Sequence, residues 1–279
     1  MTKINKPSIT KELDCAKSLL TDEVFSLFSD EIKRNFLYPY YDRYLVTLEA
    51  ILPHLIGNKD VKILDVGAGG GIIPLVLKKM GYSVTAIDTW EEYSKAYNYV
   101  KAVGVKEDII ERFDICGVQT KYCDIEKESF PFENQSFDIV LFLAVIEHLH
   151  SSPKKVLKEI ERVLAPNGIL VLETPNHANL RNRLYLLFGK SVGTELFNWF
   201  NREPFFEHVR EYTLDEVKKM LAWTGFEVKR VELDDHSHTR LIKDFKLKPF
   251  KLIALLIYFL ITKLVPKFRY QMIIVGQKK

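Results

Sequence analysis

The sequence predicts an α/β fold in which short apolar strands alternate with helices around an open, mostly parallel sheet. Two observations carry this prediction. An apolar strand pattern at 61–66 runs through a glycine-rich turn into a helix, and further strand and helix patterns follow in alternation. Of the 279 residues, 47% are hydrophobic and 28% are charged, with a net charge of +3. This composition and length suit a globular protein with one large domain, or one domain with additions.

Two helices are predicted before the first strand, at 10–28 and 40–55. In the first, apolar residues recur on one side: Leu13, Ala16, Leu20, Val24 and Leu27. We expect residues 1–60 to form a helical lid packed on the edge of the sheet. The alternative is that Tyr40, Tyr41 or Tyr44 covers a bound ligand.

The first strand leads into three glycines at every second position, Gly67, Gly69 and Gly71, and then into a helix at 72–80. Glycine adopts positive φ freely and leaves no Cβ between the backbone and a ligand. A strand that turns through glycines into a helix N-terminus favours a negatively charged or nucleotide-like ligand.

Two carboxylates narrow the choice of ligand. The dinucleotide pattern G-x-G-x-x-G fails, because its third glycine would fall on Ile72. Asp65 ends the first strand, where a carboxylate repels a pyrophosphate and suits an amino group. Asp88 ends the next strand, 84–87, and can accept both hydroxyls of a ribose. A ribose and an ammonium without a pyrophosphate describe S-adenosylmethionine (SAM), and they disfavour a nicotinamide oxidoreductase.

The remaining elements continue the alternation. Helices are predicted at 90–103, 153–164, 180–188 and 213–223, the last opened by the capping box T-L-D-E. Strands are predicted at 118–123, 137–143, 169–173, 226–233 and 270–276. The turn A-P-N-G precedes the strand at 169–173.

Motifs in register across 61–233 resemble the class I SAM-dependent methyltransferases, of the type 11/23-like group. The motifs are D-V-G-A-G-G-G, A-I-D, Y-C-D-I-E-K-E-S-F-P-F, S-F-D-I-V-L-F-L-A-V-I-E-H-L, L-A-P-N-G-I-L-V-L-E-T-P-N and E-H-V-R-E-Y-T. The resemblance implies a Rossmann-like sheet of seven strands, with the last strand antiparallel and inserted beside the fifth. It also implies a SAM-binding methyltransferase domain at 61–279.

The strand motifs and this resemblance together assign the cofactor site. The expected cofactor-binding residues are Asp65, Gly67, Ala68, Gly69, Gly71, Asp88, Thr89, Asp124, Ile125 and Leu143. In the family, an acidic residue at the position of Asp124, or the residue next to it, contacts the adenine amino group. The alternative for Asp124 is a solvated acid in a loop.

The candidate catalytic residues are Glu147, His148 and His208. Methyl transfer from a sulfonium mainly requires proximity and orientation, and a general base is needed only when the acceptor loses a proton. The pair E-H ends this segment in many methyltransferases of different substrate, so a structural or cofactor-positioning role is the alternative. His208 and Arg210 can face an acceptor, or they can anchor a loop by hydrogen bonds.

No metal is expected. Some quinone-pathway relatives carry a further Glu three positions before the E-H pair and bind a metal, but Ala144 stands there in this chain. The run D-D-H-S-H at 234–238 is rich in ligand types but has no matching cluster elsewhere.

The connection 174–212 is long and aromatic, and it leaves the carboxyl end of a strand, where ligands bind in open α/β sheets. We expect a substrate cap there. The alternative is a helical insertion that only completes the core.

A second insertion, 234–267, contains ten consecutive apolar residues at 252–261, too few to span a bilayer. Residues 240–279 hold ten Lys or Arg and one acidic residue. The helix at 252–261 either docks on the sheet or the cap, or lies in the interface of an anionic membrane. The acceptor would then be a lipid or lipid-linked molecule.

Other features limit the class of acceptor and the cellular compartment of the protein. The chain lacks the N/D-P-P-aromatic motif of nucleic-acid amino methyltransferases, so no nucleic-acid partner is expected. Three cysteines form no C-x-x-C pair, and the start lacks the apolar region of a signal peptide, which favours the cytoplasm. We expect an O-methyltransferase for a small, glycosidic or lipid-linked acceptor. The alternative is a SAM-binding scaffold or regulatory subunit without its own turnover.

Overall fold

Seven strands form one sheet in the order β3-β2-β1-β4-β5-β7-β6. The computed structural model describes residues 6–90, 106–201, 207–235 and 249–279. The strands are β1 (Lys62–Val66), β2 (Ser83–Asp88), β3 (Gln119–Tyr122), β4 (Phe137–Leu143), β5 (Leu164–Pro175), β6 (Phe226–Asp234) and β7 (Gln271–Lys278). Neighbours among β1 to β5 pair in parallel, whereas β7 is antiparallel to both β5 and β6. The predicted fold class is confirmed, including the antiparallel last strand beside the fifth.

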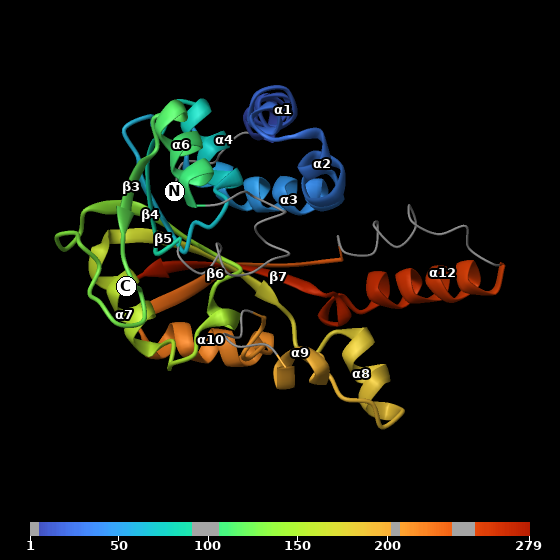
Figure 1. Ribbon diagram of the computed structural model, residues 1–279. Helices are drawn as coiled ribbons and strands as arrows, with labels where there is room; N and C mark the ends of the chain where they lie inside the picture. The colour runs from blue at the N-terminus through green and yellow to red at the C-terminus, as the bar shows by residue number, and fades with distance from the viewer. Residues whose placement is uncertain (1–5, 91–105, 202–206, 236–248) are drawn as a thin grey trace.

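Helices cover both faces of the sheet, as Figure 1 shows. On one face lie α1 (Lys6–Ser18), α2 (Asp30–Ile32), α3 (Tyr41–Ile51), α4 (Ile72–Lys79) and α6 (Lys106–Cys116). On the other face lie α7 (Lys154–Val163) and α10 (Leu214–Trp223). Because both faces are covered, the central strands are buried almost continuously instead of in alternation.

The helices before β1 are part of the core on their face of the sheet. Helix α1 continues through a π-helical stretch, Leu19–Val24, as the expected helix at 10–28 requires. Ala16, Leu20 and Val24 are completely buried, and they share one apolar cluster with β1 and α4. Because this cluster is continuous, the N-terminal helices and the sheet bury one another.

Of the three tyrosines considered as a cover, two belong to that cluster. The rings of Tyr41 and Tyr44 lie 6.4 and 6.3 Å from the ring of Phe25, edge to face. Tyr40 is 37% exposed.

Three segments depart from the predicted elements. Helices α6 and α9 (Leu196–Asn201) were not predicted. Strand β5 begins at Leu164, five residues earlier than expected, because the A-P-N-G turn pairs irregularly with β4, and Asn167 has a φ of +62°. The helix expected at 90–103 lies outside the described residues beyond Trp90.

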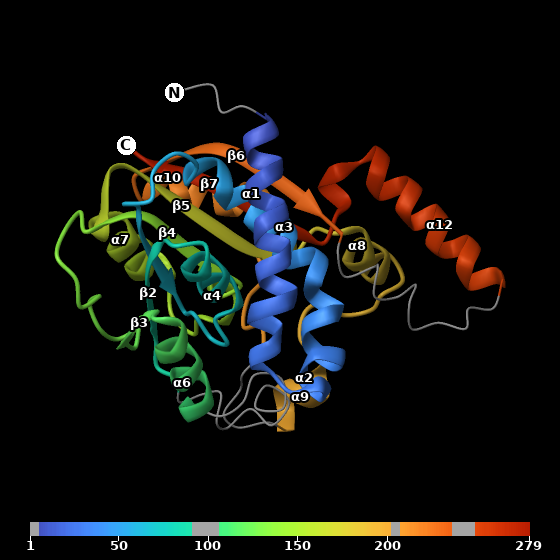
Figure 2. The ribbon, with the colours of Figure 1, turned by 90° about the horizontal axis from the view of Figure 1, so that it is seen from above.

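Helices α8 (Leu180–Leu187) and α12 (Pro249–Leu264) lie beyond the carboxyl end of β5 and before β7. Figures 1 and 2 both show α12 reaching away from the sheet. None of the described helices combines the length and the apolar character needed to cross a membrane. The three cysteines, Cys15, Cys116 and Cys123, are unpaired in the structure.

Candidate cofactor and catalytic site

The glycine loop between β1 and α4 requires its glycines. Gly67 and Gly71 both have a φ of +72°. A Cβ on Gly67 would lie 2.7 Å from a methyl group of Val145, and one on Gly71 would lie 2.2 Å from the ring of Phe113. The amides of Gly67 and Ala68 donate to the carbonyl oxygen of Ile87, at 2.9 and 3.3 Å. These bonds hold the loop against the carboxyl end of β2.

Asp88, the last residue of β2, also holds the loop. Its two carboxylate oxygens accept hydrogen bonds from the amides of Gly69, at 3.0 Å, and Trp90, at 2.8 Å. The Trp90 indole donates to the carbonyl oxygen of Gly69, at 3.3 Å, and this side chain is only 2% exposed. Trp90 was missed, because a single Trp after a strand carries no motif; its φ of +50° marks a tightly fixed turn.

Asp65 is a buried carboxylate, only 3% exposed, and none of the described residues forms an ion pair with it. Burial, followed by the charge of Asp88, raises the pKa of Asp65 to about 8. A cationic group beside these two carboxylates would stabilise both of them. The ammonium of SAM supplies such a charge, so the residues present fit that cofactor.

The remaining predicted cofactor residues lie at the carboxyl ends of β2, β3 and β4. Asp124 accepts hydrogen bonds from the Lys127 ammonium, at 2.8 Å, and from the amides of Glu126 and Lys127. Burial opposes ionisation, but the Lys127 contacts lower the pKa of Asp124. In this structure Asp124 closes a turn. Thr89, Ile125 and Leu143 are partly buried at the same edge.

Glu147 lies in the 3-10 turn Ile146–His148 after β4 and is 1% exposed. Its Oε2 accepts a hydrogen bond from the hydroxyl of Thr174, at 2.8 Å, whereas its Oε1 has no hydrogen-bond partner among the described residues. Its carbonyl oxygen accepts from the amides of Val209 and Arg210, at 2.8 and 3.1 Å. These backbone bonds bring the segment 207–210 against the carboxyl end of β4.

The three predicted catalytic residues come together there. Potential proton- or metal-binding atoms of Glu147, His148 and His208 all lie within 4.8 Å of one another. The rings of His148 and His208 are 4.9 Å apart and nearly perpendicular. His208 Nδ1 lies 2.8 Å from the carboxylate of Glu211, and His177 Nδ1 lies 3.6 Å from the other oxygen of that carboxylate.

Burial and nearby charges have opposite effects on the pKa values of Glu147 and His208. Burial raises the pKa of Glu147, and the nearby His208 opposes that rise. Burial disfavours the charged form of His208, but the hydrogen bond with Glu211 and the charge of Glu147 together raise its pKa above the ordinary value. Glu211 therefore orients His208, and His208 faces Glu147. A histidine placed in this way can accept and hold a proton.

Arg210, which the sequence places beside His208, has a different environment. Its guanidinium bonds to Glu216, at 2.9 Å, and lies 5.0 Å from the ring centre of Tyr212. Arg210 therefore anchors the start of α10, as the loop-anchoring alternative expects, while His208 faces Glu147.

A further buried carboxylate, missed from the sequence, ties the N-terminal helices to this edge of the sheet. Glu173, in β5, accepts hydrogen bonds from Arg43 at 2.5 Å, Thr47 at 2.9 Å and Gln271 at 2.8 Å. Nearby, burial and the charges of Glu211 and Glu147 raise the pKa of Tyr270 to about 12. Glu173 is visible in the motif L-E-T-P-N, but its partners are too distant in sequence to be paired with it.

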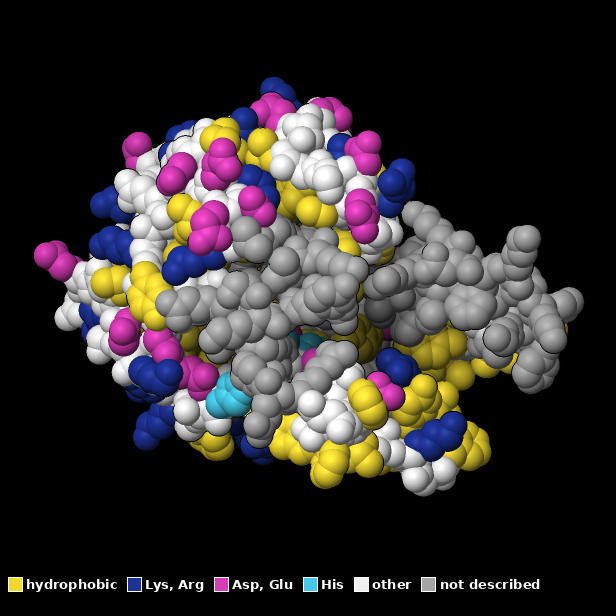
Figure 3. Space-filling model, viewed as in Figure 1, with side chains coloured by type: hydrophobic (Ala, Val, Ile, Leu, Met, Phe, Trp, Pro, Cys, Tyr) yellow, Lys and Arg dark blue, Asp and Glu magenta, His cyan; other side chains and the backbone are white. Residues whose placement is uncertain are grey.

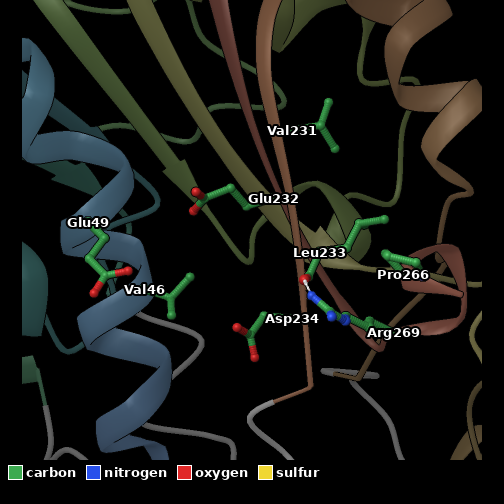
Figure 4. A pocket seen from close by; sticks show the side chains of 8 residues that line it. All are labelled: Val46, Glu49, Val231, Glu232, Leu233, Asp234, Pro266 and Arg269. Carbon is green, nitrogen blue, oxygen red and sulfur yellow. Dashed lines mark hydrogen bonds between the residues drawn. The ribbon is translucent and has the colours of Figure 1, made fainter. Parts of the chain in front are cut away.

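A cavity of about 350 Å³ lies at the outer edge of the sheet, between α3, β6 and the turn Pro266–Phe268. Figure 4 shows Arg269 in it, donating a hydrogen bond to the carbonyl oxygen of Leu233 at 2.8 Å. Strands β4, β5 and β7 separate β6 from β1. This cavity is therefore distinct from the region around Asp65 and Asp88.

Comparison with known proteins agrees with this fold. Residues 64–172 match the family described as Methyltransferase domain. The ubiquinone biosynthesis O-methyltransferase of Rickettsia canadensis is 29% identical over 186 residues, which are 66% of this chain and 70% of that protein. The one of Rickettsia prowazekii is 28% identical over 194 residues, 67% of this chain and 68% of that protein.

Solved structures show the same fold. A SAM-dependent methyltransferase from Archaeoglobus fulgidus superposes with a TM-score of 0.53 at 18% identity, covering 87% of this chain and 99% of the other. One from Methanosarcina mazei gives 0.50 at 20% identity, covering 81% and 96%. The matched domain and the named relatives together support a class I SAM-dependent methyltransferase. The chain is an enzyme of that class, and SAM is its cofactor.

The position of Asp88 leads to a binding prediction. We expect Asp88→Ala to weaken SAM binding by about 1.5–3 kcal/mol, because it removes a charge-assisted acceptor for the ribose hydroxyls. It also removes the hydrogen bond that holds the amide of Gly69. Isothermal titration calorimetry measures this. Asp215→Ala, at an exposed position on α10, serves as the control. Unchanged SAM affinity in a folded Asp88→Ala protein would remove Asp88 from the site.

Proposed function

We propose that this enzyme methylates a hydroxyl group of a small acceptor that is glycosidic or lipid-linked. Two curated relatives are O-methyltransferases by name, which supports oxygen as the accepting atom. The observation that carries the proposal is the group formed by Glu147, His208 and Glu211. A hydroxyl acceptor must lose a proton during methylation, and this group offers a base at the carboxyl edge of the sheet.

Each residue has a distinct role in the proposed step. SAM, when bound, supplies an activated methyl group on a sulfonium. Glu211 accepts a hydrogen bond from Nδ1 of His208, which leaves Nε2 to take the proton of the acceptor hydroxyl. The acceptor oxygen would then bond to the methyl carbon as the methyl–sulfur bond breaks, and the cofactor would leave as a neutral thioether. Glu147 stabilises the resulting imidazolium by its charge. The chain otherwise contributes orientation and the exclusion of water.

The segments around this group are the proposed substrate and cofactor covers. The connection 174–212 includes His208, which lies at the carboxyl end of β4. We assign this connection as the substrate cap. Arg43 and Thr47 attach α3 to Glu173 at the same edge, which supports the assignment of residues 1–60 as a lid. The cofactor residues proposed from the sequence line the ends of β1 to β4.

A screen with radiolabelled SAM tests the proposal. Phenols, sugars and prenylated or glycosylated lipids are offered as acceptors, and labelled products are separated and identified. We expect label on an oxygen of one acceptor class. A protein that binds SAM by calorimetry but labels no acceptor would instead be the scaffold or regulatory subunit considered above.

A chelator distinguishes a general base from a metal site at the same residues. We expect dialysis against EDTA to leave methyl transfer unchanged, because the group has its own hydrogen-bond network and Ala144 replaces the further acidic ligand. Activity before and after dialysis measures this, with addition of Mg²⁺ or Zn²⁺ as the second arm. Loss of activity that a divalent ion restores would show that Glu147, His148 and His208 bind a metal.

A further inference from the structure

Helix α12 presents an apolar stripe to solvent. Five large side chains are 53–72% exposed: Ile253, Leu256, Ile257, Leu260 and Leu264. Their spacing of three, four, seven and eleven positions places them on one side of the helix. Thr262, which is 2% exposed, lies on the opposite side and faces the protein. An exposed helix face normally carries polar residues, so this stripe indicates an apolar partner.

A second exposed apolar surface lies on α8, α9 and the connection between them. Leu186, Leu187, Phe188, Leu196, Phe197, Trp199 and Phe200 are 56–81% exposed. The guanidinium of Arg183, in α8, lies 5.0 Å from the ring centre of Phe268, which follows α12. Figure 3 shows hydrophobic side chains along the lower right of the molecule, over α8, α9 and the part of α12 that is coloured. Contiguous apolar patches of this kind mark interaction sites.

Basic residues accompany these apolar surfaces. Residues 180–201 and 249–269 together contain seven Lys or Arg and a single acidic residue, Glu195. Arg181, Arg183 and Lys190 are exposed around α8, and Lys263 and Lys267 are exposed at the end of α12. Long basic side chains can lie along apolar surface and reach anionic groups beside it.

From these observations we infer that α8, α9 and α12 dock on the surface of an anionic phospholipid bilayer. The exposed leucine, isoleucine and aromatic side chains enter the boundary between headgroups and acyl chains, and the basic side chains contact lipid phosphates. A second copy of the same surface is a poorer partner, because a symmetric contact would bring two sets of positive charges together. The inference goes beyond the proposed methyl transfer, since docking requires no catalysis.

Docking in this way has a consequence for the substrate cap. Helices α8 and α9 belong to the connection 174–212, which also carries His208. Attachment of these helices to a bilayer would bring the proposed cap to the lipid surface. A lipid-linked acceptor would then reach the enzyme from the membrane.

Vesicle sedimentation with the full-length protein tests the inference. Vesicles of equal parts phosphatidylglycerol and phosphatidylcholine are compared with vesicles of phosphatidylcholine alone, at low and high salt. We expect binding to the anionic vesicles at low salt that weakens severalfold at high salt. Ile257→Glu should weaken binding about tenfold or more, because it places a charge in the apolar stripe. Lys263→Ala and Lys267→Ala should each weaken it about fivefold.

Matched variants separate docking from general effects. Ile115→Glu makes the same change at a 68% exposed position on α6, away from α12 in both ribbon views, and should bind like the wild type. Trp emission provides a second measurement, because Trp90 is buried and Trp199 and Trp223 are exposed. A vesicle-induced blue shift should persist in Trp223→Phe and disappear in Trp199→Phe.

Three outcomes would overturn the inference. The first is that the wild-type protein stays in the supernatant with anionic vesicles at low salt. The second is that Ile257→Glu binds these vesicles as tightly as the wild type. The third is that the protein binds no vesicles and analytical ultracentrifugation shows a dimer that Ile257→Glu dissociates, which would make the surface an interface between copies. None of these depends on the acceptor screen, so failure of docking and failure of the proposed function are distinguishable.

Discussion

Replacing His208 with alanine is expected to lower kcat for a hydroxyl acceptor by about 10²–10⁴-fold, the usual contribution of a positioned general base. The affinity for SAM should change little, because His208 lies with Glu147 and Glu211, whereas Asp65 and Asp88 lie in β1 and at the end of β2. Steady-state kinetics with the acceptor from the screen, and calorimetry with SAM, measure the two effects separately. Glu211→Gln should cause a smaller loss, since it keeps an acceptor for Nδ1 of His208 and removes only the charge beside the imidazole.

The matched control for His208 is His150→Ala. His150 lies in the same segment as Glu147 and its nitrogen lies 3.8 Å from a carboxylate oxygen of Glu126, but it is outside the group around His208. Its loss should leave kcat near the wild-type value. A large loss of SAM affinity in His208→Ala with unchanged acceptor kinetics would instead place 174–212 on the cofactor side.

The pH dependence of turnover follows from the same group. The pKa of His208 is raised, so its base form is populated only above a pH higher than the ordinary value for histidine, about 6.5. We expect kcat/KM to rise with pH through that region and to level off above it. His208→Ala should lose this dependence along with its activity.

Asp65→Asn is expected to weaken SAM binding about 100-fold at pH 8 and, at the same time, to stabilise the protein without SAM. The carboxylate is the group we assign to the SAM ammonium, and a charge-assisted bond of this kind contributes about 3 kcal/mol. In the free protein, burial and the charge of Asp88 raise the pKa of Asp65 to about 8. Ionisation of this residue is therefore unfavourable until SAM binds.

The sign of the stability effect follows from the raised pKa. An unfolded Asp ionises near pH 4, whereas folded Asp65 keeps its proton up to about pH 8. The stability that Asp65 contributes is fully present below pH 4 and is lost as the pH rises through about 8. Asp65→Asn should therefore raise Tm by a few degrees at pH 8, on the order of 1–2 kcal/mol, and have little effect near pH 4.

Thermal unfolding across this pH range, with and without SAM, measures the effect. SAM binding at pH 7 should also release a proton, which calorimetry in buffers of different ionisation enthalpy detects. Asp60→Asn, an exposed residue just before β1, is the control and should behave like the wild type. If Asp65→Asn bound SAM normally, the ammonium would have to bind elsewhere.

The sequence by itself determined the succession of the seven strands along the chain, the glycine loop and the acidic ends of β1 and β2. These features depend on local causes: apolar periodicity, the backbone freedom of glycine, and the place of a residue at the end of a strand. The T-L-D-E capping box is another example, since its hydrogen bonds join residues three positions apart, and the structure forms both of them. The inserted antiparallel β7 was also predicted, but only through resemblance to a family.

Only the tertiary structure decided which distant side chains meet. Glu147 and His208 are far apart in sequence, and they come together because the amides of Val209 and Arg210 bond to the carbonyl oxygen of Glu147. Arg43 meets Glu173 only after α3 packs against β5 and β7. The ten apolar residues at 252–261 are evident in the sequence, but they do not show which side of α12 faces solvent. Packing decides this, because it buries Thr262 and leaves Leu256 and Leu260 exposed. Contacts of this kind depend on the closure of long loops, for which no local pattern in the chain provides a signal.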